Sequence, residues 1–431
     1  MSTLLRLATA GSVDDGKSTL VGRLLHDTKS ILADQLDAVE RVSRERGLET
    51  ADLALLTDGL RAEREQGITI DVAYRYFATP KRSFVLADCP GHVQYTRNTV
   101  TGSSTADVIV LLVDARHGVV EQTRRHLAVA SLLRVPHVII AVNKIDLVGF
   151  AEDAFRSVET QVRKVIDELG IPGVTVIPVS ALNGDNIAEN SAETPWYSGP
   201  NLLELLETLP AGEDPEGQPF RLPVQYVLRP QAAAVDPKFV EYRGYAGQIA
   251  SGVVSVGDQI SVLPSGRTAT ITGIDTADGE LTEAFAGQSV SVRLSDDIDL
   301  SRGDLIAGAE GAPIPTREVE ALVCWLHDRP LRPGDKVLLK HTTRTVRAIV
   351  RELDSRLDLD TLTGVPAQQL DLNDIGRVQL RLADEISAET YAESRQTGSF
   401  LLIDAQTGHT LAAGMIRNTV PEDLSATDWV I

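Results

Sequence analysis

The chain has 431 residues, and at about 100 to 200 residues per domain this length predicts two or three domains, of which we expect three. The residues are 43% hydrophobic and 24% charged, an ordinary balance that excludes a chain disordered as a whole. The formal net charge of -20 disfavours nucleic-acid binding through bulk electrostatics, because phosphate contacts need clustered Lys and Arg. We therefore expect no nucleic-acid partner.

Two cysteines, Cys89 and Cys324, exclude a disulfide framework, and no Cys/His spacing indicates a zinc site. The longest apolar run, Val108 to Val113, is far shorter than the ~20 residues that a membrane-spanning helix needs. The N-terminal segment also lacks the layout of a signal peptide. These observations predict a cytoplasmic protein without a membrane partner.

Short apolar runs alternate with amphipathic segments over the first half of the chain. The runs cover residues 4–10, 84–88, 108–114, 137–143 and 174–180. Runs of this length, rich in Val and Ile, are typical of strands buried on both faces of a parallel sheet with helices between them. In residues 72–88, two strand-like runs flank a polar turn and predict an antiparallel edge hairpin. Residues 30–57 have apolar side chains near helical spacing and predict a helical insertion.

The alternation ends at a stretch rich in Pro, Gly and acidic residues, LPAGEDPEGQP at 209–219, which predicts a linker. Beyond it, Gly and Pro interrupt short strand-like segments about every 8 to 12 residues, a spacing typical of β-barrels. A second break, GAPIPT at 311–316, begins another strand-rich region. We therefore expect an α/β domain at 1–212 and two β-barrel domains at 213–312 and 313–431.

The first predicted strand leads into GSVDDGKS at 11–18, which fits the phosphate-loop pattern G-x-x-x-x-G-K-[ST]. Between a strand and a helix, such a loop presents backbone amides and a helix N-terminus to phosphate groups. Lys17 would reach the β- and γ-phosphates, and Ser18 would bind Mg²⁺. An alternative is a glycine-rich turn that fits the pattern by chance. The nucleotide-binding residues expected here are Gly11, Ser12, Val13, Asp14, Asp15, Gly16, Lys17, Ser18 and Thr19.

Two more motifs follow predicted strands and disfavour a chance match. DCPG at 88–91 places the Asp88 carboxylate near a metal and the Gly91 amide near the γ-phosphate. In NKID at 143–146, Asp146 could accept hydrogen bonds from N1–H and the 2-amino group of guanine, a donor pair that adenine lacks. Such a site rejects the wrong base by ~10⁴ or more, because its buried polar groups are left unpaired. Further pocket residues would be Asn143, Lys144 along the base, and the amides of Ser180, Ala181 and Leu182.

Together with GITI at 67–70, these motifs resemble the GTPase domain of the elongation-factor superfamily, and the strand-rich remainder resembles its second and third domains. The resemblance implies an α/β P-loop GTPase domain with GTP and Mg²⁺ as ligands. It also implies that Thr69 closes onto Mg²⁺ and the γ-phosphate, and that His92 orients the attacking water, so that hydrolysis proceeds by in-line attack. The alternative for His92 is a solvent-exposed loop histidine. The resulting expectations are catalytic roles for His92, Lys17 and Thr69, metal contacts from Ser18, Thr69 and Asp88, and surface or core positions for other histidines such as His26, His126 and His137.

Longer segments outside the phosphate-contacting motifs resemble the GTPase-subunit family of bacterial sulfate adenylyltransferase. These segments cover residues 58–77, 92–98, 114–126, 194–207, 397–404 and 411–415. The resemblance implies a heteromeric enzyme in which a separate small catalytic subunit makes adenylyl sulfate and pyrophosphate from ATP and sulfate. This subunit would couple GTP hydrolysis to that unfavourable reaction. The sequence contains a single phosphate loop, so we expect no fused adenylyl-sulfate kinase in it.

Two other functions stay open. One is an elongation factor Tu-like translation GTPase that delivers aminoacyl-tRNA, although Ser12 and Asp15 replace the two histidines of the common GHVDHGK form. The other is a GTP-binding module that supports its partner without turnover, which Thr69 and His92 disfavour. Residues 30–57 and 95–104 adjoin the predicted switch segments and are candidates for a partner surface, or else helices packed on their own domain.

Overall fold

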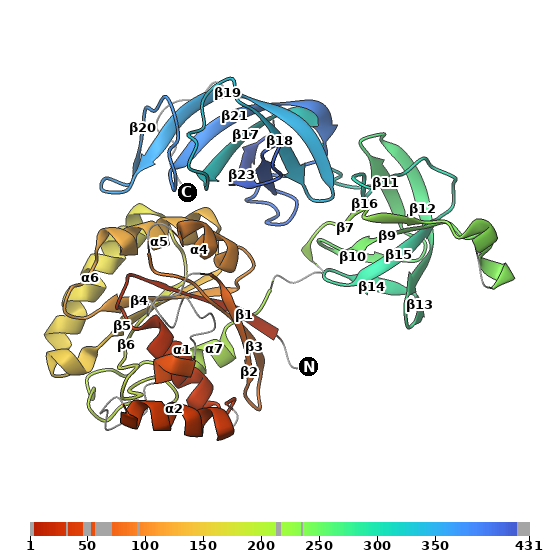
Figure 1. The fold of residues 1–431 in the computed structure, drawn as a ribbon. Helices are drawn as coiled ribbons and strands as arrows, with labels where there is room; N and C mark the ends of the chain where they lie inside the picture. Colours follow the sequence, from red (N-terminus) through yellow and green to blue (C-terminus); the bar gives the residue numbers. More distant parts are fainter. Residues whose placement is uncertain are drawn as a thin grey trace. The chain divides into compact units, whose positions relative to one another are not determined.

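The computed structural model describes residues 4–31, 33–45, 53–56, 71–92, 95–212, 217–233 and 236–419. It divides into two compact units, the first formed mainly by the chain up to Gly212 and the second by the chain beyond it (Figure 1). Among the residues described, no helix is long and apolar enough to cross a membrane.

A six-stranded sheet organises the first unit. Its strands are β1 (Leu4–Gly11), β2 (Ala73–Ala78), β3 (Ser83–Asp88), β4 (Val108–Asp114), β5 (His137–Asn143) and β6 (Val174–Pro178), in the order β2-β3-β1-β4-β5-β6. Neighbouring strands are parallel except β2 and β3, which form an antiparallel hairpin at the edge. The predicted parallel strands and edge hairpin are therefore confirmed.

Helices cover both faces of this sheet, with α1 and α7 on one side and α4, α5 and α6 on the other (Figure 1). Every residue of β4 is consequently buried, which explains why its sequence is a continuous apolar run. The apolar side chains of α6 lie on one face and pack inward, as the helical period requires. The helices are α1 (Lys17–Asp27), α2 (Ala33–Glu45), α4 (Thr96–Ser103), α5 (Glu121–Leu132), α6 (Glu152–Glu168) and α7 (Leu202–Thr208), with short 3₁₀ turns η1 (Leu53–Leu56) and η3 (Ile145–Val148).

The predicted helical insertion at 30–57 contains α2 and η1, while residues 32, 46–52 and 57 lie outside the described part of the chain. η1 packs directly on α1 at Gly22. A Cβ atom at Gly22 would collide with the carbonyl group of Leu53, so only glycine permits this approach. The insertion is therefore helical where it is described, and it is fixed to the helix that follows the phosphate loop.

The second unit consists of two large β-sheets and a short two-stranded ribbon. The first contains β7 (Arg221–Pro223), β8 (Tyr226–Leu228), β9 (Gly244–Gln248), β11 (Gln259–Leu263), β12 (Arg267–Thr276), β13 (Gly279–Leu281), β15 (Ser289–Leu294) and β16 (Leu305–Gly308). β10 (Val253–Ser255) and β14 (Glu283–Phe285) form a separate ribbon, and two 3₁₀ turns are η5 (Gln231–Ala233) and η6 (Pro237–Phe239). Backbone bonds from Arg221 N to Ser251 O and from Ala250 N to Arg221 O join the chain after β9 to β7.

The second of these sheets closes into a barrel. Its order is β18-β22-β23-β17-β21-β19-β20, and an additional pairing of β18 with β19 closes the ring. Trp325 is fully buried inside it. The strands are β17 (Thr316–Trp325), β18 (Lys336–His341), β19 (Arg344–Asp358), β20 (Thr363–Val365), β21 (Ile375–Ile386), β22 (Ser399–Ile403) and β23 (Thr410–Asn418).

Each of the three larger sheets packs against its own hydrophobic core. The cores draw on residues between Leu5 and Leu206, between Phe220 and Ile306, and between Val319 and Ile416. This arrangement agrees with the expected α/β domain and two β-barrels, although the two barrels form one compact unit. The boundaries at 212 and 312 stay a prediction, and residues 213–216 of the predicted linker lie outside the described residues.

A buried ion pair connects the two strand-rich sheets of the second unit. Arg221 on β7 donates from Nη2 to Glu389 Oε1 (2.8 Å) and from Nε to Glu389 Oε2 (3.2 Å). The Arg221 and Glu389 side chains are only 1% and 11% exposed. Thr397 Oγ1 donates a further hydrogen bond to the same carboxylate. The guanidinium is therefore withdrawn from water and depends on Glu389 for its counter-charge.

We expect Glu389→Ala to lower the free energy of unfolding by about 3–5 kcal/mol, because it leaves the Arg221 charge buried and unpaired. Urea unfolding followed by circular dichroism measures the loss. Glu385→Ala is the matched control, since its ion pair with Arg317 spans 3.8 Å between half-exposed side chains and is worth less than about 1 kcal/mol. Equal losses in the two variants would contradict the structural role assigned to Glu389.

Candidate nucleotide-binding site

The loop between β1 and α1 folds around a buried lysine ammonium. Lys17 is the first residue of α1, and its Nζ donates to the carbonyls of Gly11 (3.0 Å) and Ser12 (2.7 Å). Burial lowers the pKa of Lys17, and the nearby carboxylates of Asp15 and Asp88 oppose that shift. Since neutral carbonyls compensate only part of a buried positive charge, an anion entering this loop would stabilise it.

The backbone of the loop is held in a conformation suited to anion binding. Asp14 and Gly16 both have positive φ angles, 64° and 94°, and such alternation turns successive N–H groups toward one concavity. Asp15 stabilises the turn because its Oδ2 accepts from the Ser12 amide at 2.6 Å. Burial raises the pKa of Asp15, which the Ser12 bond partly offsets. The remaining predicted loop residues are Val13, which is exposed, and Ser18 and Thr19, which are half-buried in the first turn of α1.

The DCPG segment packs directly on the phosphate loop. Asp88 ends β3, is 2% exposed, and accepts a hydrogen bond on Oδ1 from Thr9 Oγ1 at 2.8 Å. A Cβ atom at Gly91 would collide with Lys17 Nζ and come within 2.7 Å of the Gly11 carbonyl oxygen. Position 91 therefore has to be glycine, and its backbone adjoins the ammonium group that the sequence assigns to phosphate binding.

The chain continues from Gly91 into the predicted water-orienting residue. The His92 ring is half-buried and packs edge-on against Tyr95, with centroids 6.1 Å apart. The His92 carbonyl accepts from the Tyr95 amide at 3.0 Å, which connects the loop to the start of α4. Thr69, the other predicted switch residue, lies outside the described residues. The catalytic roles of both residues stay predictions.

Cys89, between Asp88 and Gly91, is fully buried. Its Sγ lies where α4 approaches closely, because a Cβ atom at Gly102 would come within 2.5 Å of it. Burial raises the pKa of the thiol well above its ordinary value. Cys89 is therefore a packing residue beneath the loop.

Asn143, at the end of β5, ties the phosphate loop to the predicted base pocket. Its Nδ2 donates to the carbonyl of Asp15 at 2.7 Å, and its Oδ1 accepts from the amide of Ala181 at 2.9 Å. Ser180 and Ala181 are buried, whereas Leu182 is 56% exposed at the end of the same loop. One buried amide side chain thus fixes the spacing between the two loops that are predicted to bind phosphate and base.

The two other predicted base-pocket residues of the NKID motif are Lys144, just before η3, and Asp146, within it. Lys144 Nζ donates to the carbonyl of Asp14 and forms an ion pair with Asp114 Oδ2 at 2.9 Å. Asp146 Oδ1 is buried without a hydrogen-bond partner among the described residues. A buried carboxylate oxygen without a partner is costly. The donor pair of a guanine edge would satisfy it, so the residues present fit this base.

Sequence reasoning missed two side chains that brace these loops, Asp114 and Arg23, and expected His126 at a surface or core position. Asp114, at the end of β4, accepts from Arg116; although burial alone would raise its pKa, the bonds from Arg116 and Lys144 hold it well below the usual range. Arg23 on α1 donates to the carbonyls of the 180–182 loop. His126 lies in the core behind Gly11, where burial, and then the nearby Lys17, lower its pKa to about 3. The position of Asp114 at a strand end was the one available signal.

The residues that the sequence assigns to the metal fit Mg²⁺ in part. The Ser18 hydroxyl and the Asp88 carboxylate belong to the two loops that meet at Lys17. Within the described residues, no group of three or more His, Cys, Asp and Glu side chains is arranged to hold a metal. Mg²⁺ commonly binds proteins through one or two side chains and completes its shell with phosphate and water.

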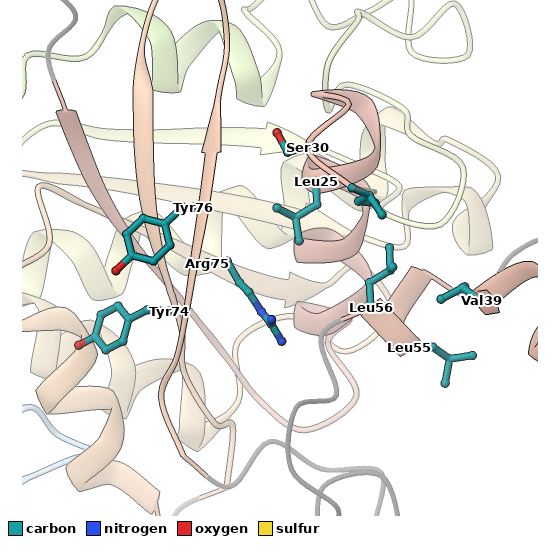
Figure 2. Close-up of a pocket in the computed structure, with 9 residues that line it drawn as sticks. Leu25, Ser30, Val39, Leu55, Leu56, Tyr74, Arg75 and Tyr76 are labelled. Carbon is teal, nitrogen blue, oxygen red and sulfur yellow. The ribbon is translucent and has the colours of Figure 1, made fainter. Parts of the chain in front are cut away.

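A separate cavity of about 470 Å³ lies beside the helical insertion. Figure 2 shows Leu25, Leu55 and Leu56 on one side of it and Arg75 with two tyrosines of β2 on the other. Among the predicted nucleotide-site residues that the structure describes, none lines this pocket. In the described part of the chain, this pocket lies between the insertion, the end of α1 and β2.

Comparisons with known proteins agree with this geometry. Residues 2–211 match the elongation factor Tu GTP binding domain, and residues 318–417 match the GTP-eEF1A C-terminal domain-like family. A solved structure of Sup35 complexed with GMPPNP covers 98% of this chain and 95% of its own at 24% sequence identity, with a TM-score of 0.44, too low to add to the assignment.

Curated relatives are similar over nearly the whole chain. The bifunctional enzyme CysN/CysC of Mycobacterium tuberculosis is 53% identical over 97% of this chain and 68% of its own length. Sulfate adenylyltransferase subunit 1 of Bacteroides fragilis is 48% identical over 99% of this chain and 88% of its own length. The subunit 1 of Alteromonas mediterranea is 44% identical over 98% and 89%. By this similarity, the chain belongs to the sulfate adenylyltransferase subunit 1 family, among the elongation factor Tu-like GTPases.

Proposed function

We propose that this chain is the GTP-hydrolysing subunit of a sulfate adenylyltransferase. The observation that carries the proposal is the meeting of three loops. Lys17 of the phosphate loop adjoins Gly91, and Asn143 bonds both Asp15 and Ala181. One ligand with phosphates at one end and a purine at the other would touch all three loops. The relatives named sulfate adenylyltransferase subunit 1 support the reaction that this ligand serves.

In this proposal, Lys17 and the amides of residues 11–19 bind the phosphates of GTP. Asp146 accepts hydrogen bonds from N1–H and the 2-amino group of guanine, and its buried, unpartnered Oδ1 supports that role. Lys144 lies along the base. Ser18, Asp88 and Thr69 would hold Mg²⁺, which when bound neutralises charge on the phosphate oxygens.

Hydrolysis in this site relies on positioning and charge stabilisation. His92 orients a water molecule for in-line attack on the γ-phosphate, and Thr69 helps to close the site around it. The buried Lys17 ammonium stabilises the negative charge that builds up on the phosphate oxygens as the bond between GDP and the γ-phosphate breaks. Because Lys17 is already held by two carbonyls, it needs little reorganisation during the reaction.

We expect His92→Ala to keep GTP affinity within about threefold while lowering the hydrolysis rate by about 10²-fold or more, since one positioned group is lost from the transition state. Equilibrium binding and single-turnover phosphate release measure the two effects. His409→Ala, which removes an exposed histidine of the second unit, serves as the control. Full turnover in His92→Ala would contradict the assignment.

Asp146→Asn should shift the preferred base from guanine to xanthine, because the amide offers a donor where xanthine has a carbonyl oxygen. Competition between GTP and xanthosine triphosphate measures the change, which we expect to exceed tenfold. Asp153→Asn on the exposed side of α6 is the control. An unchanged preference for GTP would argue against base reading by Asp146.

A heteromeric partner is part of the proposal, since the relatives are named as one subunit of an enzyme. We propose that a small catalytic subunit forms adenylyl sulfate and pyrophosphate from ATP and sulfate, in the cytoplasm, while this chain supplies the free energy of GTP hydrolysis. α2 and η1 in the insertion, and α4 after His92, are the candidate surfaces for that subunit. Ordering of the switch segments by the γ-phosphate would alter what they present.

With the small catalytic subunit added, GTP should drive more adenylyl sulfate formation at equilibrium than a non-hydrolysable GTP analogue, because only turnover couples the two reactions. The measurement is the final yield at fixed ATP and sulfate. Equal yields would favour a purely supporting GTP-binding module. GTPase activity stimulated by ribosomes, without adenylyl sulfate formation, would favour a translation factor.

A further inference from the structure

Arg23 joins the helix after the phosphate loop to the loop of residues 180–182. Its Nε donates to the carbonyl of Ala181 at 3.2 Å, and its Nη2 donates to the carbonyl of Leu182. Nη1 lies 3.7 Å from Asp27 Oδ1, and the Arg23 side chain is 19% exposed. A single guanidinium fork therefore holds two successive peptide groups of a loop that lies more than 150 residues away in the sequence.

These two contacts determine where the amides of the loop point. In a trans peptide the carbonyl and the N–H face opposite ways. Because the Ala181 carbonyl faces Arg23, the N–H of Leu182 faces away from it. The Ala181 amide is already bonded to Asn143 Oδ1 (2.9 Å), and the Asn183 amide to Ser180 Oγ (3.3 Å). Among the described residues, the Leu182 amide has no such partner, so it is the donor left for a ligand.

We infer that Arg23 is a positioning residue for guanine recognition, which aims the Leu182 amide at the 6-oxygen of the base. The inference rests on the proposed GTP site. Guanine carries its 6-oxygen beside N1–H and the 2-amino group. Asp146 Oδ1, buried and unpartnered, would accept from those donors, while Leu182 donates to the oxygen. On one edge of the base, Asp146 would thus recognise the donors and Leu182 the acceptor.

Charge as well as geometry makes arginine suited to this role. Leu182 is 56% exposed, so packing alone does little to fix the end of the loop. A guanidinium bonded to a carbonyl polarises the peptide group, which makes the N–H on its far side a stronger donor. The two carbonyls are held by two separate nitrogens, a fork that a lysine ammonium does not reproduce.

A 6-thioguanosine nucleotide separates this role from a merely structural one. It keeps N1–H and the 2-amino group but replaces the 6-oxygen with sulfur, a weaker acceptor. Inosine nucleotides keep the 6-oxygen and lack the 2-amino group that Asp146 reads. Binding of GDP, 6-thio-GDP and IDP by titration calorimetry, with the full-length chain, avoids turnover during the measurement.

We expect Arg23→Ala to bind GDP about tenfold more weakly, the loss typical of a charge-assisted hydrogen bond. Its preference for GDP over 6-thio-GDP should shrink, while its preference for GDP over IDP should stay as in the unaltered protein. The GDP affinity of Arg23→Lys should fall between those of Arg23→Ala and the unaltered protein, because lysine keeps the charge and one carbonyl bond. Asp27→Asn weakens the ion pair with Arg23 and the contact between Asp27 Oδ1 and His26 Nδ1, but it leaves both carbonyl bonds of Arg23 in place, so it should bind all three nucleotides normally.

The inference fails if Arg23→Ala binds GDP as well as the unaltered protein does. It also fails if all three affinities fall by one common factor, since that is the signature of a loosened pocket. If Arg23→Ala does not fold, Arg23→Lys carries the same comparison. Failure of the unaltered protein to bind GDP would overturn the proposed function, and the inference with it.

Discussion

A buried positive charge is the constraint on which the rest of the nucleotide site depends. Lys17 is 8% exposed, and neutral carbonyls from its own loop hold its ammonium group in place. Keeping it there requires the left-handed turns at Asp14 and Gly16, and a glycine at 91, where a side chain would collide with it. The turn residues, the DCPG segment and the start of α1 thus meet one electrostatic requirement, which is to keep a cation out of water. In the proposed site, phosphates would bind beside that cation.

The parallel sheet supplies the second condition, because it brings distant parts of the sequence to one edge. β1, β3 and β5 end next to the phosphate loop, the DCPG segment and the NKID motif respectively. The carboxyl ends of parallel strands are where ligands bind in open α/β sheets. Asn143 then fixes the separation of the phosphate and base loops through two buried hydrogen bonds. In the proposed GTP site, this single side chain would match the spacing of the two loops to the length of the nucleotide.

Much of this architecture was predictable, for identifiable physical reasons. The strands at 108–114 and 137–143 were predicted with the bounds they have, because strands covered on both faces must be apolar throughout. The phosphate loop, DCPG and NKID were recognised because their chemistry requires fixed local spacing. Three of the sheets have separate cores, while the domain boundaries placed at the breaks near 209–219 and 311–316 stay a prediction.

The residues that were missed act through contacts distant in sequence. Arg23 has no local motif, since its partners are backbone carbonyls of the 180–182 loop, and any residue type could supply them. His126 was expected at a surface or core position, and only the packing of α5 places it behind Gly11. The Arg221–Glu389 pair likewise joins residues 168 positions apart, Arg221 on β7 and Glu389 between β21 and β22, and no local motif marks either one. The spacing of residues in the sequence reveals side chains that belong to the same loop. Side chains that support a loop from a distant part of the chain become visible only in the folded structure.

Because Cys89 is buried, the reactivity of its thiol reports how often the loop above it opens. Its thiol lies beneath the loop that carries Asp88 and Gly91 and against α4 at Gly102, so a dissolved reagent has no route to it while that packing holds. The rate of Cys89 alkylation therefore depends on how often the DCPG loop separates from α4. A nucleotide that stabilises the closed loop would lower the alkylation rate, and a nucleotide that destabilises it would raise that rate.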